Sequence, residues 1–115
     1  MKRLLLSASL LAISAIAHAQ ADRGTQLYNI YCTQCHGMQG NGKGVNAAQM
    51  SIQPRDHTDT KEMSARSDDE LFKVIQQGGK SINKSVLMPG WGGNLSDDDI
   101  HALVAHLRKL CCQKN

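Results

Sequence analysis

Apolar residues recur at helical spacing in three stretches of the chain. The first stretch extends from Asp22 to Tyr31. Its core-facing positions recur at spacings of three or four and are Gly24, Leu27, Tyr28 and Tyr31. This spacing places them on one side of a helix. The predicted helix would bury a narrow stripe and lead directly into the first two cysteines of the chain.

The second predicted helix begins after Ser67. Ser67 and Glu70, three positions apart, form the pattern of a capping box, and acidic residues follow the cap where they suit the helix dipole. Gly78 and Gly79 would end this helix. Its apolar face consists of Leu71, Val74 and Ile75.

The third predicted helix begins after Ser96, with three aspartates in its first turn. Its apolar positions are Ile100, Leu103, Val104, Leu107 and Leu110. Residues 37–45 are rich in glycine and predict a loop that either presses against a bound group or lies free on the surface. Residues 46–64 predict a long loop with one short helical turn, and residues 80–94 another irregular stretch. We therefore predict an all-α fold with one domain over residues 22–110.

Residues 1–19 resemble a secretory signal peptide. Lys2 and Arg3 precede an apolar run that ends in Ala17-His18-Ala19, a small-x-small pattern typical of cleavage. The run is shorter than the ~20 residues that a membrane-spanning helix needs. We expect a periplasmic protein whose mature chain does not stay inserted in a membrane.

The remaining chain of about 95 residues has the length of one domain. Only 3% of the residues of the full chain are aromatic, so a buried cofactor would help to complete a small core. Of the 13 basic residues, Lys2 and Arg3 belong to the signal, which leaves 11 against 10 acidic residues. This balance argues against binding to nucleic acid.

Cys32-Thr33-Gln34-Cys35-His36 is the strongest motif of the chain. The C-x-x-C-H string is the sequence sign of covalent haem attachment, in which two thiols add to the two vinyl groups and the histidine binds iron. A zinc site would need two further ligands at suitable spacing, and a thioredoxin motif would need a preceding strand. A plain disulfide would not need His36.

The order of these features resembles the class I cytochromes c, in particular the small bacterial members with one haem. The resemblance covers the mature chain: a helix, C-x-x-C-H, a glycine-rich loop, a helix, a Met-Pro segment and a final helix. It implies an all-α fold of three main helices around one covalent haem c. It also implies electron transfer between redox partner proteins, by a carrier that is not an enzyme.

The resemblance also assigns roles to single residues. Cys32 and Cys35 would form the thioethers, His36 would be the proximal iron ligand, and Met88 the distal one. Met88 lies in a loop stiffened by proline, and its soft sulfur would favour reduced iron. Other methionines are available as core filler or ligand, namely Met38, Met50 and Met63. Bis-histidine ligation would instead use His57, His101 or His106, which we expect to be surface or hydrogen-bonded histidines.

Further assignments concern the edge of the haem and the crossing of the first and last helices. Trp91 would donate its indole N–H to a propionate, and Arg55 would either pair with a propionate or lie exposed. Gly24 would let the last helix approach near Leu103 or Val104. Four lysines would either surround the haem edge and contact an acidic partner or be scattered over the surface: Lys43, Lys73, Lys80 and Lys84.

Cys111 and Cys112 depart from the family pattern. They lie in a predicted tail, residues 111–115, and could be free thiols, a vicinal disulfide or the link of a disulfide-bonded dimer. Two other functions stay open: a haem-based sensor with a displaceable sixth ligand, and a haem subunit of a larger oxidoreductase.

Overall fold

The computed structural model describes residues 18–19 and 22–113. Within these residues it contains helices and loops and no strand, which confirms the all-α prediction. Residues 22–31 are α-helical. The named elements that follow are α2 (Thr33–His36), η1 (Ala47–Gln49), α3 (Thr60–Ser64), α4 (Asp68–Gln77), η2 (Gly79–Ile82) and α5 (Asp97–Cys112).

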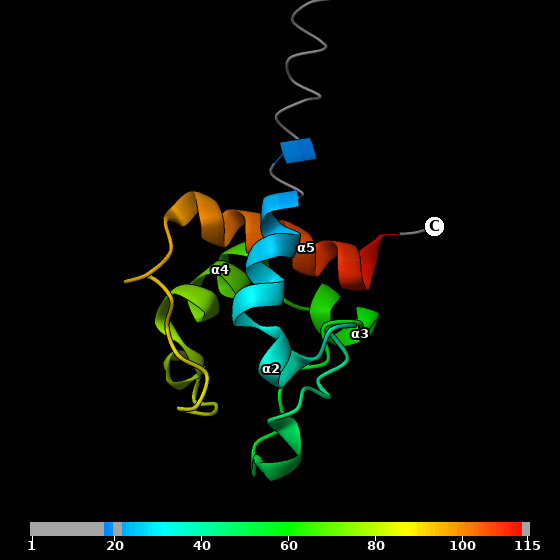
Figure 1. The fold of residues 1–115 in the computed structure, drawn as a ribbon, viewed down its shortest axis with the longest axis vertical. Helices are drawn as coiled ribbons and strands as arrows, with labels where there is room; N and C mark the ends of the chain where they lie inside the picture. The colour runs from blue at the N-terminus through cyan, green and yellow to red at the C-terminus, as the bar shows by residue number, and fades with distance from the viewer. Residues whose placement is uncertain (1–17, 20–21, 114–115) are drawn as a thin grey trace, which may run out of the picture.

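The first helix crosses α5 closely (Figure 1). Its buried residues are Gly24, Leu27 and Tyr28, as the spacing predicted. A Cβ atom on Gly24 would overlap the backbone of Ala102 in α5 and lie 3.1 Å from the Cβ of His106. Glycine is therefore required for the crossing. The close approach is at Ala102, one position before Leu103.

Both predicted helix caps are present. The Ser67 hydroxyl accepts from the Glu70 amide and the Glu70 carboxylate accepts from the Ser67 amide, so α4 begins with a full capping box. The Ser96 hydroxyl accepts from the Asp99 amide at the start of α5. Gly78 ends α4 with a φ of 86°, a conformation that favours glycine.

Helix α5 is the centre of the core and packs against α3 and α4 (Figure 1). Ile100, Leu103 and Met63 are almost fully buried there, together with Leu27 and Tyr28 of the first helix. The helix extends to Cys112, and Cys111 is only 7% exposed. The last turn is therefore part of the core rather than of a tail beginning at residue 111.

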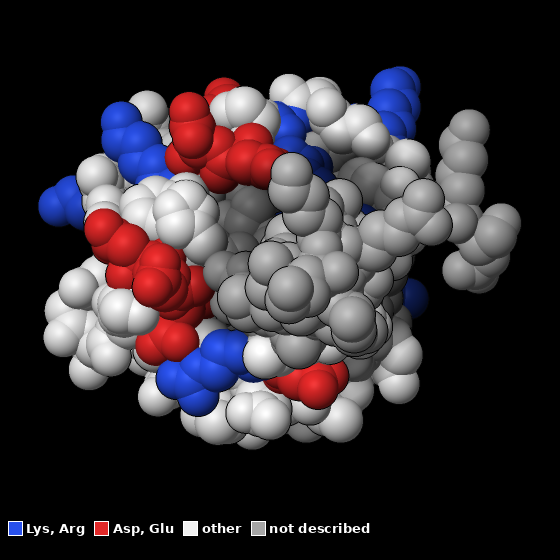
Figure 2. Space-filling view, turned by 90° about the horizontal axis from the view of Figure 1, so that it is seen from above, with Lys and Arg blue, Asp and Glu red and all other residues white. Residues whose placement is uncertain are grey.

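Acidic first turns mark the surface near the starts of α4 and α5. Their carboxylates lie at residues 68–70 and 97–99, where they interact favourably with the positive ends of the helix dipoles. Figure 2 shows acidic side chains in patches on the face seen from above, with basic side chains beside them. No helix among the described residues is long and apolar enough to cross a membrane. The predicted signal, apart from His18 and Ala19, lies outside the described residues.

Candidate functional site: a cavity around the C-x-x-C-H turn

The C-x-x-C-H motif forms one helical turn. The His36 amide donates to the Cys32 carbonyl at 2.9 Å, and the turn directly continues the first helix. Cys32 and Cys35 are both partly buried free thiols. Burial, and to a smaller extent the nearby Cys35, raises the pKa of the Cys32 thiol to about 12. Cys32 is therefore an uncharged thiol at neutral pH.

His36 is buried and carries a defined tautomer. Its Nδ1 lies 2.9 Å from the backbone carbonyl oxygen of Arg55. Because a carbonyl only accepts, Nδ1 carries the hydrogen and Nε2 has a free lone pair. Burial lowers the pKa of His36, whereas the bond to Arg55 acts in the opposite direction. A neutral imidazole with its Nδ1–H bonded to a carbonyl is the form that binds a metal through Nε2.

A second imidazole, His57, lies flat against His36. The two ring centroids are 4.1 Å apart with an interplanar angle of 18°. His57 is 8% exposed, and its Nδ1 lies 3.0 Å from the hydroxyl of Tyr28. Burial first, and then charge repulsion from the neighbouring basic side chains, lowers the pKa of His57 to about 2. His57 is thus a neutral, hydrogen-bonded core residue, and the sequence alone did not indicate its stacking on His36.

These side chains line a cavity of about 400 Å³. This volume lies within the range of cofactor-binding pockets. The cavity is lined mainly by apolar side chains that come from the first helix, residues 50–57, α3, α4 and the segment 79–91. All six residues predicted to bind the cofactor are among its lining residues: Cys32, Cys35, His36, Arg55, Met88 and Trp91.

The Met88 segment is held by main-chain hydrogen bonds to the end of α4. The amides of Trp91 and Gly92 donate to the carbonyls of Ile75 and Gln76 at 2.9 and 3.0 Å. These carbonyls belong to the last turn of α4, where no further helical amide can reach them. The Gly79 amide also donates to the Met88 carbonyl at 3.0 Å. The segment therefore caps α4 and fixes the backbone of Met88 beside the cavity.

Of the other methionines and histidines considered as iron ligands, some line the cavity and some lie outside it. Met50 and Met63 also line the cavity, but Met63 is fully buried in the core. Met38 does not line it and is 68% exposed. His101 and His106 lie outside its lining as well.

Arg55 contributes its backbone carbonyl to the site in this structure. Its guanidinium pairs with the Glu62 carboxylate at 2.9 Å, and both side chains are substantially exposed. Trp91 packs against Tyr31 with ring centroids 4.9 Å apart. Of the four lysines considered for the haem edge, Lys84 alone lines the cavity.

The glycine-rich loop packs behind the motif. The amides of Gly42 and Gly44 donate to the carbonyls of His36 and Cys35 at 2.8 and 3.0 Å. None of its residues 37–45 is among those that line the cavity. The glycines allow close contact with the α2 backbone, because a Cβ atom on Gly44 would overlap Gln34.

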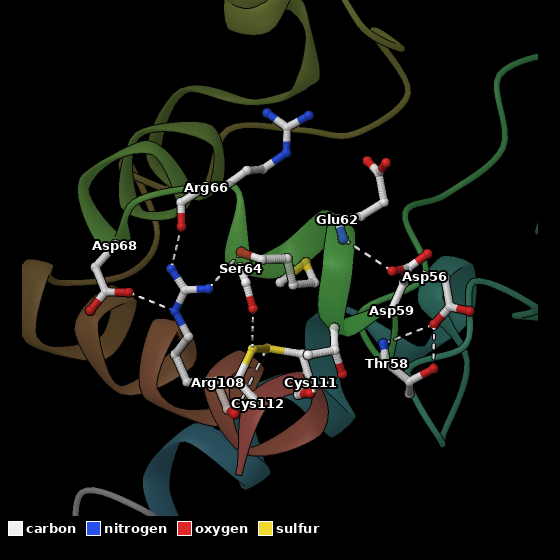
Figure 3. Close-up of a disulfide and its surroundings, with 12 residues drawn as sticks. Asp56, Thr58, Asp59, Glu62, Ser64, Arg66, Asp68, Arg108, Cys111 and Cys112 are labelled. Atoms are coloured by element: carbon white, nitrogen blue, oxygen red, sulfur yellow. Dashed lines mark hydrogen bonds and ion pairs between the residues drawn. A yellow bond between two sulfur atoms is a disulfide. The ribbon is translucent and has the colours of Figure 1, made fainter. Parts of the chain in front are cut away.

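The two C-terminal cysteines form a disulfide with each other (Figure 3). The prediction of a disulfide-linked dimer through either residue finds no support, since neither sulfur is free in this structure. The Ser64 hydroxyl lies 3.7 Å from the Cys112 sulfur, and the Thr60 hydroxyl donates to the Cys111 carbonyl at 2.6 Å. These contacts hold the last turn of α5 against α3.

Comparisons with known proteins agree with this geometry. Residues 19–107 match the family model of cytochrome c oxidase, cbb3-type, subunit III. No curated protein sequence matches the chain significantly.

Two solved structures show the same fold. One is the KustC0563 c-type cytochrome, with a TM-score of 0.63 and 24% identity over 76% of this chain and 96% of that one. The other is the Kuenenia stuttgartiensis reducing HAO-like protein complex Kustc0457/Kustc0458, with a TM-score of 0.63 and 24% identity. That match covers 77% of this chain and 41% of the other. Since the family model spans most of the chain and the cavity surrounds a C-x-x-C-H turn, the chain belongs to the monohaem cytochrome c family, whose members transfer electrons through haem.

Proposed function

We propose that this protein is a periplasmic carrier of single electrons whose haem is attached through Cys32 and Cys35. The observation that carries the proposal is the cavity lined by two free thiols, a neutral imidazole and a methionine. A bound haem iron would supply a one-electron couple there. The chain's own contribution is to hold and tune that iron.

His36 and Met88 are the proposed iron ligands. His36 presents Nε2 because its Nδ1–H is used by the Arg55 carbonyl, and this bond also raises the basicity of the ring. Met88 comes from a segment fixed by the hydrogen bonds at the end of α4. A neutral thioether stabilises reduced iron, and so raises the reduction potential.

The mostly apolar lining has two consequences for this function. It excludes water from the cofactor and thereby favours the less charged, reduced state. It also offers no group of three His, Cys, Asp or Glu residues, in the described part of the chain, that could hold a separate metal ion. The apolar lining therefore suits a largely apolar redox group.

The exposed rim of the cavity suits contact with a protein partner. Ile52, Ile82 and Leu87 line the cavity and are 47%, 39% and 61% exposed, and Lys84 lies among them. Apolar side chains at the edge of a redox group allow close contact, and a basic side chain favours an acidic partner. We propose that donor and acceptor proteins use this rim.

The test is an optical redox titration combined with mass spectrometry of the protein produced with a haem-maturation system. We expect the mass of one added haem, a single one-electron transition, and the weak red absorption band of sulfur ligation in the ferric form. Met88→Ala should remove that band and lower the potential. Met38→Ala is the matched control and should change neither.

Three outcomes would each contradict part of the proposal. A mature protein without added haem mass would exclude the carrier function. Loss of the sulfur band in Met50→Ala, with retention in Met88→Ala, would reassign the distal ligand. Rapid, tight binding of carbon monoxide by the reduced protein would favour the sensor function instead.

A further inference from the structure

The stacking of His57 on His36 constrains the ring that would bind iron. At a centroid distance of 4.1 Å and an angle of 18°, the rings are nearly parallel and in contact. The hydrogen bond from Nδ1 to Arg55 holds one edge of the His36 ring, whereas His57 covers one of its faces. Together they restrict both the tilt and the rotation of the imidazole.

His57 is itself firmly held. Its Nδ1 lies 3.0 Å from the Tyr28 hydroxyl, and its backbone amide donates to the Gly40 carbonyl at 2.6 Å. Tyr28 is 1% exposed, and its ring contacts that of His106 in α5 at a centroid distance of 4.7 Å. The stacked pair is therefore connected to the packed crossing of the first helix and α5.

We propose that His57 is a positioning residue that sets the plane of the His36 imidazole relative to the haem. This inference rests on the proposed function, because it concerns a ligand of the proposed cofactor. Groups behind a metal-bound histidine fix its orientation and tune the metal. In ferric haem the plane of an axial imidazole determines how unpaired spin is distributed over the ring, which the proton resonances of the four haem methyl groups report.

The chain offers variants that separate stacking from hydrogen bonding. His57→Ala removes the ring, whereas His57→Phe keeps a flat ring and loses the bond to Tyr28. Tyr28→Phe removes only the hydroxyl. The matched control is His101→Ala, since His101 also contacts an aromatic ring, that of Phe72 at 4.6 Å, and neither of these two residues lines the cavity.

The experiment is proton NMR of the four ferric, haem-loaded variants beside the wild type. We expect His57→Ala to change the order and spread of the haem methyl resonances. His57→Phe should restore most of the wild-type pattern, and Tyr28→Phe should produce a smaller change in the same direction as His57→Ala. His101→Ala should keep the wild-type pattern.

The results distinguish this inference from the proposed function. A wild-type protein without haem methyl signals would contradict the haem carrier itself. If the wild type carries haem and His57→Ala leaves the methyl pattern unchanged, the positioning role alone is overturned. Should His57→Ala fail to fold, an unchanged methyl pattern in Tyr28→Phe would overturn the positioning role equally.

Discussion

Replacing Arg108 tests how the last helix holds α3 and the start of α4. Its guanidinium donates to the Met63 and Arg66 carbonyls at 2.7 and 2.5 Å and pairs with the Asp68 carboxylate at 2.7 Å (Figure 3). Hydrogen bonds from a charged group to a carbonyl contribute about 1.5–3 kcal/mol each when poorly solvated. The Asp68 side chain is 70% exposed, so its ion pair contributes at most about 1 kcal/mol.

We therefore expect Arg108→Met to lower the free energy of unfolding by about 2–4 kcal/mol, since the two carbonyls are partly rehydrated in the variant. For a domain of this size, that corresponds to a decrease in Tm of roughly 8–30 °C. Asp68→Asn, the matched control, should cost less than about 1 kcal/mol. Arg108→Lys should lie between the two, because one ammonium cannot reach both carbonyls and the carboxylate.

The assay is chemical unfolding of the haem-loaded proteins, followed by far-ultraviolet circular dichroism. Equal losses in Arg108→Met and Asp68→Asn would refute the reasoning, because the ion pair would then account for the whole effect. A loss below about 1 kcal/mol in Arg108→Met would show that water replaces the guanidinium at both carbonyls.

Three other predictions follow from the packing and charges of α5. Gly24→Ala should destabilise the protein by about 1–3 kcal/mol despite the better helix propensity of alanine, because its Cβ would overlap the α5 backbone. Gly93→Ala, with nothing within 4 Å of the added Cβ, should be nearly neutral in the same chemical unfolding experiment. The hydrogen bond from Arg23 is the main reason why the pKa of Asp99 is lowered. The ionised carboxylate therefore stabilises the fold at neutral pH, and this contribution is lost as the pH falls through the folded-state pKa. The stability difference between wild type and Asp99→Asn should therefore shrink on acidification, and a constant difference from pH 7 to pH 3 would contradict it. Because Cys111 and Cys112 are bonded to each other, non-reducing electrophoresis should show a monomer, and a band of dimer mass would disagree.

The helices were predictable because their signals are local. Ser67 and Ser96 carry the caps, and Gly78 has the positive φ that its place after the apolar stripe predicted. The C-x-x-C-H turn and the cavity position of Met88 likewise follow from short motifs. Their roles as cofactor ligands stay predictions, since no cofactor contact tests them.

The rest of the site depends on the path of an irregular segment. Residues 50–57 have no hydrophobic period, so nothing in the sequence indicated that the Arg55 carbonyl meets His36 or that His57 stacks on it. The sequence predicted one short turn over residues 46–64, whereas the structure has two, η1 and α3. Asp59 caps α3 by accepting from the Glu62 amide, a local signal that the prediction did not use. The packing of α3 on α5 and of η1 on α2 depends on tertiary contacts, which a pattern confined to the segment cannot reveal.

Main-chain contacts explain how so short a chain, with few aromatic residues, surrounds a large cavity. The end of α4 is capped by the amides of Trp91 and Gly92, and the carbonyls of α2 accept from the glycine-rich loop. Each of these bonds fixes a segment of the cavity lining without a bulky side chain, because glycine allows the backbones to approach. The large side chains are thereby left for the crossing of the first helix with α5. The chain thus separates a packed scaffold from a cavity whose lining segments are fixed by backbone hydrogen bonds, and we propose that this cavity holds the haem.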